Sequence, residues 1–297
     1  MSTAHSKPSR SRKPNRSGQN DPSHGNDAGG HNGGRQAPKA RQKGGAKGGS
    51  RGGSKGAPGL WLFGKHAVMA ALANRERTIH RLVVAPDIAE ALSAPGALRE
   101  GCPKPEPQPR DRINALLSAD ALHQGFAAQV APLEPPHLDQ VAHDAPEDAV
   151  FMLLDGITDE RNVGAILRSA AAFSVSGVIV QDRRAPEESG PLAKTACGAL
   201  ETVPLIRVPN LSRALEDMQK LGYWCLGLDG DGEHSLATAK PDGRMVLVLG
   251  SEGDGMRRLV RETCDQIARI PMPGDMESLN VSATAAIALY EVVARRR

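Results

Sequence analysis

The feature that most constrains the fold of this chain is a regular alternation of short apolar runs and helical segments after residue 149. The runs are rich in Val, Ile, Leu and Met, and we expect strands at 150–154, 178–180, 203–208, 224–228, 245–249 and 266–270. Strands that are apolar on both faces and alternate with helices form a parallel sheet with helices on each side. The pattern therefore predicts an α/β fold with a mostly parallel C-terminal sheet.

The segments between these strands carry apolar residues at helical spacing. We expect helices at 162–173, 192–200, 211–221, 256–264 and 279–295. Ligands of parallel sheets bind beyond the carboxyl ends of the strands. The functional site is therefore expected in the loops that follow residues 154, 228, 249 and 270.

A smaller α/β domain is predicted upstream, at residues 60–133. Its expected elements are helices at 64–74 and 111–122 and strands at 79–85 and 126–130, the first strand ending before Pro86. Residues 134–148 contain several prolines and are interpreted as an interdomain linker. The C-terminal domain then covers residues 149–297.

The first 59 residues are predicted to be a disordered, basic tail rich in Gly and Ser. Between Ser2 and Gly59 there is no Val, Leu, Ile, Met, Phe, Tyr, Trp or Cys, so the segment cannot bury enough apolar surface to fold. It carries 12 Lys and Arg residues against 2 Asp, whereas the formal net charge of the whole chain is only +3. An RNA-binding arm and a solubilising tail both fit this composition, and a transit peptide would need an apolar face.

The cysteines give no sign of a disulfide framework or a zinc site. Cys102, Cys197, Cys225 and Cys264 are far apart, and none belongs to a C-x-x-C pair. The sequence has no long apolar run that would indicate a signal peptide or a membrane span. We therefore expect a cytoplasmic protein with no membrane association and no metal.

The first candidate loop leads into the helix that contains Asn162, Gly164 and Arg168. A helix N-terminus offers free N–H groups and partial positive charge, which suits a phosphate. Arg168 is either a surface residue with a buried stem or a clamp for phosphate. Taken alone, the pattern favours the surface residue.

The second loop has glycines at positions 250, 253 and 255 after an apolar strand, which indicates a close approach of backbone to a ligand or a tight turn. Their spacing differs from the G-x-G-x-x-G fingerprint of dinucleotide sites, so a nucleotide-dependent dehydrogenase is disfavoured. Glu252 by itself is consistent with an exposed loop acid. The Asp229/Asp231 pair lacks the glycine of a calcium loop, because His234 stands there.

The third loop runs from Ile270 to the start of the last helix. Ser278 is interpreted as the N-cap, since serine accepts hydrogen bonds from the amides of the first turn. Capping explains Asn280 and Ser282 less well, because Asn and Ser are poor helix formers.

Together the three loops resemble the sequence motifs of the SpoU/TrmH-like branch of the SPOUT methyltransferase superfamily. Asn162-x-Gly164-x-x-x-Arg168 resembles motif one, Gly250-Ser251-Glu252-Gly253 resembles motif two, and Ile270-Pro271-Met272 with Ser278-Leu279-Asn280-Val281-Ser282 resembles motif three. The motifs stand in the family's order, and the resemblance covers about residues 60–297. The segments 64–68 and 123–125 resemble the start and end of the family's small RNA-binding domain. The segments 194–199 and 203–208 resemble bacterial 23S rRNA guanosine 2′-O-methyltransferases that act on the P loop.

The resemblance implies a fold that general topology rules disfavour. The C-terminal sheet would contain a deep trefoil knot, with the segment after Met245 threaded through an earlier loop. The small domain would bind RNA, and the protein would be a homodimer with its active site at the subunit interface. The cofactor would be S-adenosylmethionine, bound mainly by the backbone of Gly250, Ile270 and Leu279, with Met272 beside them.

The activity implied is methylation of the ribose 2′-hydroxyl of a guanosine in 23S rRNA, free or in a pre-ribosomal particle. Arg168 would lower the pKa of that hydroxyl as a cation and bind a neighbouring phosphate, because a guanidinium is too weak an acid to act as a base. Asn162 and Glu252 would orient Arg168 and the ribose, and Asn280 and Ser282 would shape the cofactor pocket or contact the RNA. A tRNA ribose methyltransferase and a non-catalytic protein for RNA binding or ribosome assembly are the alternatives.

Overall fold

The computed structural model describes residues 59–118, 120–239 and 243–293, which belong to one compact unit, Lys55–Arg297. The predicted basic tail lies outside the described residues. Two sheets are present in the described part of the chain, one of four strands and one of seven. No helix among the described residues is long and apolar enough to cross a membrane.

The four-stranded sheet is formed by residues 60–130. Its order is β1-β4-β2-β3, with β4 antiparallel to β1 and β2, and with β2 and β3 parallel. The strands and helices of this region are β1 (Leu60–Phe63), α1 (Lys65–Ala73), β2 (Ile79–Val84), α2 (Pro86–Leu92), β3 (Pro105–Pro107), α3 (Arg110–Asn114) and β4 (Phe126–Val130). The predicted helix at 64–74 is confirmed as α1, and its buried residues are Ala67, Val68, Ala71 and Leu72.

One helix prediction in this region needs correction, and one helix was not predicted. The helix expected at 111–122 ends at Asn114. Ile113 is buried against Val83 and Ala127, whereas Leu117, which packs against the same core, is only partly buried. Leu116 is 37% exposed, so continuing the helix would bury little more apolar surface. Pro86 does end β2, as predicted, but it also starts α2, where a proline in the first turn loses no hydrogen bond.

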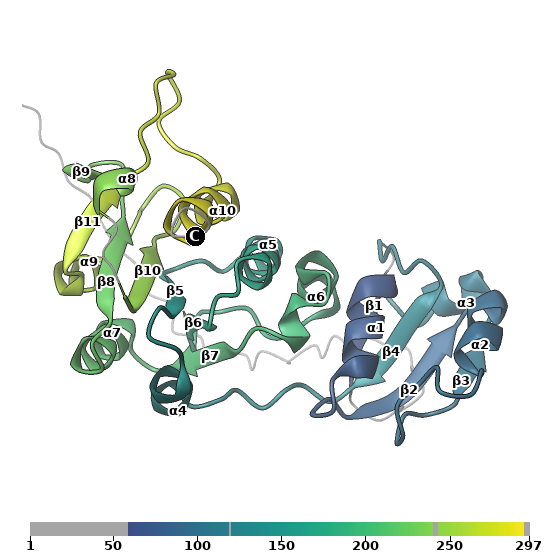
Figure 1. Ribbon diagram of the computed structural model, residues 1–297. Helices are drawn as coiled ribbons and strands as arrows, with labels where there is room; N and C mark the ends of the chain where they lie inside the picture. The colour runs from purple at the N-terminus through teal and green to yellow at the C-terminus, as the bar shows by residue number, and fades with distance from the viewer. Residues whose placement is uncertain (1–58, 119, 240–242, 294–297) are drawn as a thin grey trace, which may run out of the picture. The chain divides into compact units, whose positions relative to one another are not determined.

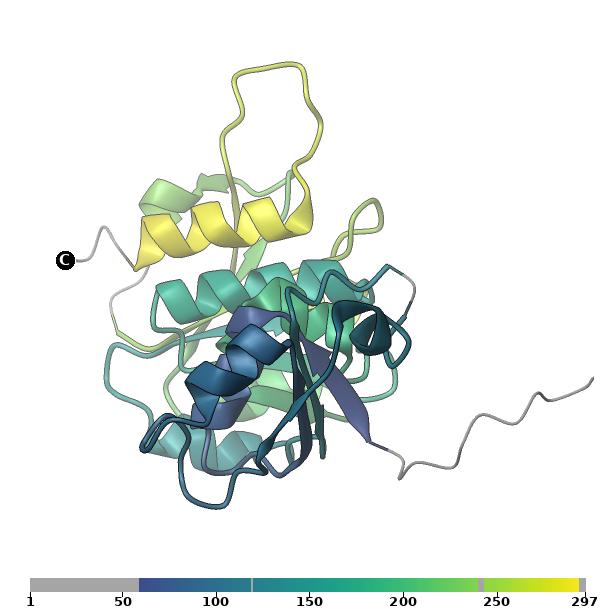
Figure 2. The ribbon, with the colours of Figure 1, turned by 90° about the vertical axis from the view of Figure 1, so that its right-hand side faces the viewer.

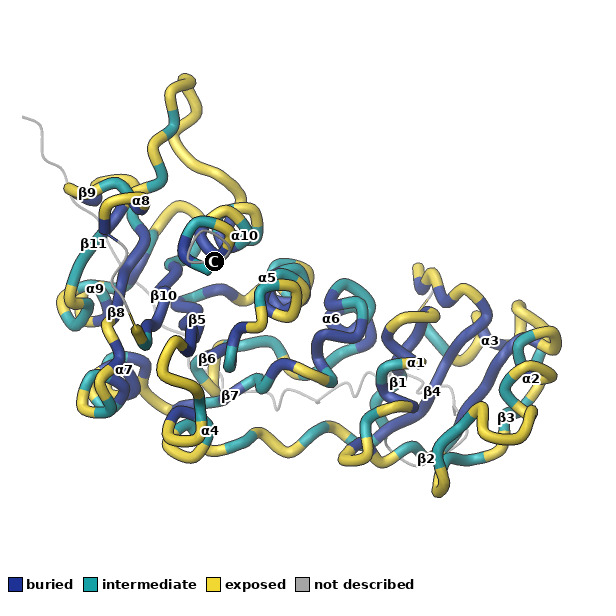
Figure 3. Tube along the Cα trace, in the orientation of Figure 1, coloured by how far each residue is buried: buried dark blue, intermediate teal, exposed yellow. Residues whose placement is uncertain are grey.

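The seven-stranded sheet is parallel throughout, which confirms the predicted α/β class. Its order is β7-β6-β5-β10-β8-β11-β9, and β10 lies between β5 and β8 (Figure 1). The strands are β5 (Val150–Leu154), β6 (Gly177–Gln181), β7 (Leu205–Val208), β8 (Trp224–Leu228), β9 (His234–Ser235), β10 (Met245–Leu249) and β11 (Gln266–Arg269). Every residue of β5 and β10 is buried, and both strands are dark blue in Figure 3.

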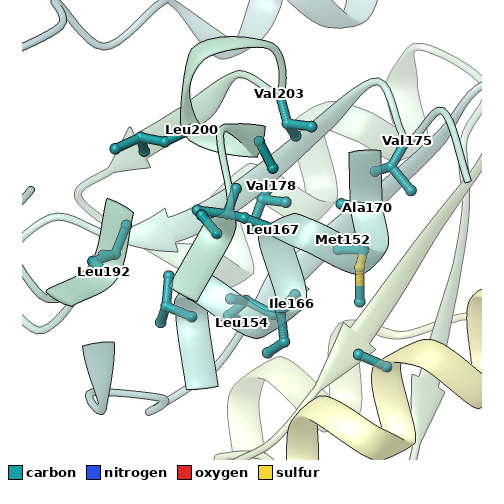
Figure 4. Packing of buried hydrophobic residues seen from close by; sticks show 14 of the residues in the cluster. Met152, Leu154, Ile166, Leu167, Ala170, Val175, Val178, Leu192, Leu200 and Val203 are labelled. Carbon is teal, nitrogen blue, oxygen red and sulfur yellow. The ribbon is translucent and has the colours of Figure 1, made fainter. Parts of the chain in front are cut away.

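Helices cover both faces of this sheet. They are α4 (Leu138–Asp144), α5 (Glu160–Ala172), α6 (Gly190–Ala196), α7 (Leu211–Lys220), α8 (Leu236–Ala239), α9 (Arg258–Thr263) and α10 (Val281–Val292), with a 3₁₀ turn at Ala199–Glu201. Ile166 and Leu167 of α5 pack with Met152 and Leu154 of the sheet on one face (Figure 4). Residues of α4, α7 and α9 pack on the other face against Phe151 and its neighbours. The alternation of side chains along a strand places successive residues in these two cores.

The predicted linker at 134–148 contains a helix that sequence analysis missed. Leu138, Val141 and Ala142 of α4 pack into the core beneath the sheet, and Ala142 is fully buried. The hydroxyl of Tyr223 donates a 2.8 Å hydrogen bond to the carbonyl of Ala142. The prolines at both ends obscured a short apolar stripe at helical spacing, so this segment is partly a structural element and not only a connection.

The helix expected at 192–200 is interrupted. Cys197 and Gly198 have φ values of 52° and 95°, in the left-handed region, so α6 ends at Ala196 and the chain turns into Ala199–Glu201. A Cβ atom on Gly198 would lie 2.8 Å from the Cβ of Ala70, so a side chain there would clash with α1. Tertiary contact with α1, and not local propensity, therefore favours glycine at this corner.

Arg77 connects the first sheet to the segment around α6 through a buried ion cluster. Its side chain is fully buried, with Nη2 2.7 Å from Glu201 and Nη1 2.6 Å from Glu188. Nη1 also donates to the carbonyl of Ala131 at 2.8 Å. Burial raises the pKa of Glu188, and the charge of Arg77 opposes that rise.

Replacing Arg77 by Met is expected to lower the free energy of unfolding by about 3 kcal/mol or more, because two buried carboxylates lose their cation. A carboxyl whose pKa is raised on folding stabilises the folded state at low pH, and this stabilisation is lost as the pH rises through the folded pKa. Arg77→Met raises the pKa of Glu188 further, so the loss is expected to be larger near about pH 8 than near about pH 5. Urea unfolding of the wild type and of Arg77→Met at both pH values measures the loss of unfolding free energy.

Arg81→Met is the matched control. Arg81 and Glu106 also lie 2.7 Å apart, but their side chains are 42% and 40% exposed, so the expected loss is below about 1 kcal/mol. Equal losses for the two variants would show that burial does not set the strength of the Arg77 cluster.

Candidate active site

A pocket of about 220 Å³ lies where β8, β10 and β11 end. It is lined by Leu228 and Leu249 at two strand ends and by Ile270 directly after the third. All four residues expected to bind the cofactor, Gly250, Ile270, Met272 and Leu279, line it. The pocket therefore lies at the carboxyl edge of the sheet, where parallel sheets bind ligands.

The glycine loop after β10 folds back on itself. Ser251 and Gly255 exchange two backbone hydrogen bonds, of 3.1 and 3.0 Å. A Cβ atom at Gly250 would lie 2.1 Å from the carbonyl carbon of Gly255. Only glycine fits at position 250 in this turn, which brings the backbone to the wall of the pocket.

Asp155 holds this loop from beneath, a contact that sequence analysis missed. Its carboxylate is 1% exposed and accepts hydrogen bonds from Arg257, at 2.6 Å from Nε and at 2.7 Å from the backbone N–H. The backbone N–H of Asp155 also donates to the carbonyl of Leu249 at 2.8 Å. The available signal was an acid directly after a buried strand, where a charge needs a partner.

Four of the five predicted catalytic residues converge beside the pocket. The amide of Asn280 donates to Asn162 at 3.1 Å and to Glu252 at 2.7 Å, so the three loops meet at one side chain. Glu252 also accepts from the backbone N–H of Val281 at 3.1 Å. The backbone N–H and hydroxyl of Ser282 donate to Oδ1 of Asn280, at 2.9 and 2.5 Å.

The same contacts correct the expected helix cap. Asn280, and not Ser278, is the N-cap of α10, because its side chain accepts from the backbone N–H of Ser282. Figure 2 shows the long loop between β11 and α10, in yellow, which leaves the sheet and returns at this cap. Asn280 thereby serves two purposes, since its Oδ1 caps the helix while its Nδ2 joins the other two loops.

Arg168 does not join this cluster. It is exposed and lines a separate hollow of about 510 Å³, together with residues of α1 and of the corner after α6. Six residues of helix separate it from Asn162, which is about 9 Å along the axis and about 120° around it. Among the described residues the Arg168 guanidinium has no hydrogen-bond or ion-pair partner.

Gly164 has a packing role. A Cβ atom there would lie 2.7 Å from the carbonyl oxygen of Leu192 and 2.9 Å from the Cβ of Thr195. The glycine of the first motif therefore lets α5 and α6 approach closely, which fixes both helices beside the site.

Four further residues line the pocket and were not predicted as site residues: Asp229, Gly230, Glu277 and Thr284. Asp229 and Gly230 follow the strand that ends at Leu228, whose loop was expected to contribute to the site although neither residue was given a role in it. The described residues contain no group of three or more His, Cys, Asp or Glu that could hold a metal.

Two family models match this chain. Residues 149–290 match the SpoU rRNA methylase family, and residues 61–136 match the substrate-binding domain of RNA 2′-O ribose methyltransferases. The first match contains the pocket and the Asn280 cluster, and the second contains the four-stranded sheet.

Curated relatives agree with these models. The 23S rRNA (guanosine-2′-O-)-methyltransferase RlmB of Vibrio vulnificus is 45% identical over 181 residues, which cover 59% of this chain and 72% of the relative. The RlmB protein of Xanthomonas campestris is 36% identical over 249 residues, which cover 80% of this chain and 96% of the relative.

Solved structures share the fold. The SpoU methyltransferase AviRb of Streptomyces viridochromogenes, in complex with AdoMet, has a TM-score of 0.67 at 24% identity, over 80% of this chain and 89% of that one. The AdoMet-bound rRNA methyltransferase of Sinorhizobium meliloti has a TM-score of 0.65 at 23% identity, over 80% and 87%. The sequence motifs, the pocket formed by their loops, and the matches to family models and curated relatives together show that the chain belongs to the SpoU rRNA methylase family.

Proposed function

We infer that this chain is an RNA 2′-O-methyltransferase that uses S-adenosylmethionine and methylates the ribose of a guanosine in 23S rRNA. The observation that carries this conclusion is the junction at Asn280, where the loops of all three motifs meet beside a pocket at the edge of the sheet. The substrate follows from curated relatives with this activity that are 36% to 46% identical to the chain.

The pocket suits an adenosyl group. Its walls include the apolar side chains of Leu228, Leu249, Ile270 and Leu279, and the backbone at Gly250 comes close enough to bind a ligand directly. S-adenosylmethionine supplies an electrophilic methyl group on a positively charged sulfur. We propose that Gly250, Ile270, Met272 and Leu279 bind it.

We propose a homodimer in which Arg168 completes the active site of the other subunit. Two observations support this proposal. The Arg168 guanidinium is exposed on a side of α5 away from the pocket of its own chain. The outer side of α10 exposes Ile287 and Tyr290, at 43% and 58%, with the Tyr290 ring centroid 6.5 Å from that of Phe173. An exposed apolar helix face beside the site suits a second copy of the chain.

In this arrangement the residues have distinct roles. The partner subunit's Arg168 faces the ribose, stabilises negative charge that develops on the 2′-oxygen and binds a neighbouring phosphate. Asn162 and Glu252 hold Asn280, and through it the ribose, in a fixed orientation. Asn280 and Ser282 form the polar rim between the cofactor and the RNA.

We also propose a domain plan and a topology. The small RNA-binding domain covers residues 60–133, and the methyltransferase domain covers 149–297. The matched ranges 61–136 and 149–290 support these boundaries. The deep trefoil knot that the family resemblance implies is supported by the position of β10 between β5 and β8. The proposed site of action is the cytoplasm, where the RNA substrate is found.

The test is a map of ribose methylation in 23S rRNA from cells that lack this protein. We expect one 2′-O-methylguanosine to disappear and to return with the wild-type gene. The same cells serve as the source of RNA for methyl transfer by the purified protein. A full set of 23S rRNA methylations, together with a missing tRNA ribose methylation, would contradict the assigned substrate.

Deletion of residues 1–58 is expected to weaken RNA binding about tenfold at low salt, because 12 basic residues that can displace counterions are removed. The dependence of log affinity on log salt should also become shallower. Affinity titrations at several salt concentrations measure both effects. Replacing the 12 basic residues by Gln keeps the length of the tail and should have the same result as deletion, whereas an unchanged salt slope would show that the tail does not contact RNA.

A further inference from the structure

The hollow beside Arg168 has a second polar wall that the proposed catalytic roles do not use. His66, in the first turn of α1, lines it together with Arg168 of α5, and Thr202 and Cys197 line it too. The remaining lining residues are small: Ala70, Ala171, Ala196, Gly198 and Ala199. A volume of about 510 Å³ lies within the range of pockets that bind small molecules or parts of larger ligands.

The chemistry of this hollow favours an anion. Its described lining residues include a guanidinium and an imidazole, both of which donate hydrogen bonds, and no Asp or Glu, while the hydroxyl of Thr202 already donates to the carbonyl of Ala199 at 3.3 Å. The nearest acid along the chain, Glu201, is directed elsewhere, because it accepts from Arg77 and Asn74. Both Arg168 and His66 are exposed, and neither has a hydrogen-bond or ion-pair partner among the described residues.

The position of His66 is fixed by packing. The Cβ of Ala70, one helical turn further along α1, would lie 2.8 Å from a Cβ on Gly198, and the carbonyl of His66 would lie 3.3 Å from it. Helix α1 therefore contacts the glycine corner that follows α6. This contact fixes the backbone that carries His66 beside the hollow.

We propose that His66 and Arg168 of one chain form a subsite for a phosphodiester of the substrate RNA, next to the ribose that is methylated. The inference rests on the proposed function and adds a second residue to its RNA site. In RNA the 3′-phosphate is attached to the carbon adjacent to the one that carries the 2′-hydroxyl. A guanidinium that reaches the 2′-oxygen therefore lies near a phosphate, and the facing imidazole N–H donates to the same strand.

His66 is thus a positioning residue, and its loss should affect RNA binding more than the chemical step. Replacing His66 by Ala is expected to raise KM for 23S rRNA about tenfold, the loss of one hydrogen bond to a charged group. KM for S-adenosylmethionine and kcat should change by less than about twofold, since His66 does not line the cofactor pocket. His66→Gln keeps an N–H donor and should restore most of the affinity.

His143→Ala is the matched control, because His143 is an exposed histidine of α4, outside the small RNA-binding domain, that does not line the hollow. It should leave KM for RNA unchanged. Direct binding of a 23S rRNA fragment in the presence of S-adenosylhomocysteine, with the melting temperature of each variant, separates lost contacts from lost stability.

The outcomes separate this inference from the proposed function. Normal RNA affinity in His66→Ala, with methylation of 23S rRNA intact in the wild type, would overturn the subsite and leave the function standing. An equal loss in His66→Ala and His66→Gln would overturn the hydrogen-bonding role. Absence of 23S rRNA methylation by the wild-type protein would overturn the function itself.

Discussion

Arg168→Ala is expected to lower the rate of methyl transfer about a thousandfold, the effect of removing a group that stabilises charge in the transition state. The side chain is exposed and contacts no ionic partner among the described residues, so the melting temperature and the affinity for S-adenosylmethionine should be nearly unchanged. Single-turnover transfer of a labelled methyl group to 23S rRNA measures the rate, and calorimetry measures cofactor binding.

Two further variants define the role of this guanidinium. Arg168→Lys keeps the charge but loses the planar fork, and it should give an intermediate rate. Arg213→Ala removes an exposed arginine of α7, whose side chain is 70% exposed, and should leave the rate within about twofold. A near-normal rate in Arg168→Ala would contradict the assignment of Arg168 to catalysis.

Gly250→Ala is expected to weaken S-adenosylmethionine binding about a hundredfold, because the new methyl group would occupy the space of the Gly255 backbone at 2.1 Å. The turn must open to accept it, and the pocket wall moves with the turn. Calorimetric titration with the cofactor measures the loss.

Gly274→Ala is the control for this experiment. Gly274 lies in the loop between β11 and α10, where an added Cβ meets no atom within 4 Å, and it should change cofactor affinity by less than about twofold. Unchanged cofactor binding in Gly250→Ala would show that the turn after β10 does not form the cofactor site.

The strands and helices that are marked by their own apolar residues were predicted well. Six of the seven parallel strands and α1, α5 and α7 have continuous or helically spaced apolar residues, and the structure confirms them, whereas the two-residue strand β9 was not predicted. The break after α6 was not predicted because it depends on contact between Gly198 and Ala70, which are distant in sequence. Helix α4 was missed because its few apolar residues stand among prolines.

Sequence motifs identified the residues of the site but not the position of Arg168 relative to the other four. The motifs identified Asn162, Glu252, Asn280 and Ser282, and the structure brings these residues together. Helix geometry alone indicates that Asn162 and Arg168 point in different directions, since six residues correspond to about 600° of rotation. In the proposed homodimer Arg168 acts at the partner's pocket, and no pattern within one chain specifies such a contact.

The most direct test of this account is the activity of a mixed dimer of Arg168→Ala and Gly230→Trp subunits, isolated with two affinity tags. Gly230 lines the cofactor pocket, and a Cβ there meets no atom within 4 Å, so the Trp side chain should fill the pocket while the fold is kept. Each variant alone should be inactive. If Arg168 serves the partner's pocket, the mixed dimer contains one complete active site and should recover about half of the wild-type activity. A mixed dimer as inactive as its two parents would contradict an active site shared between subunits.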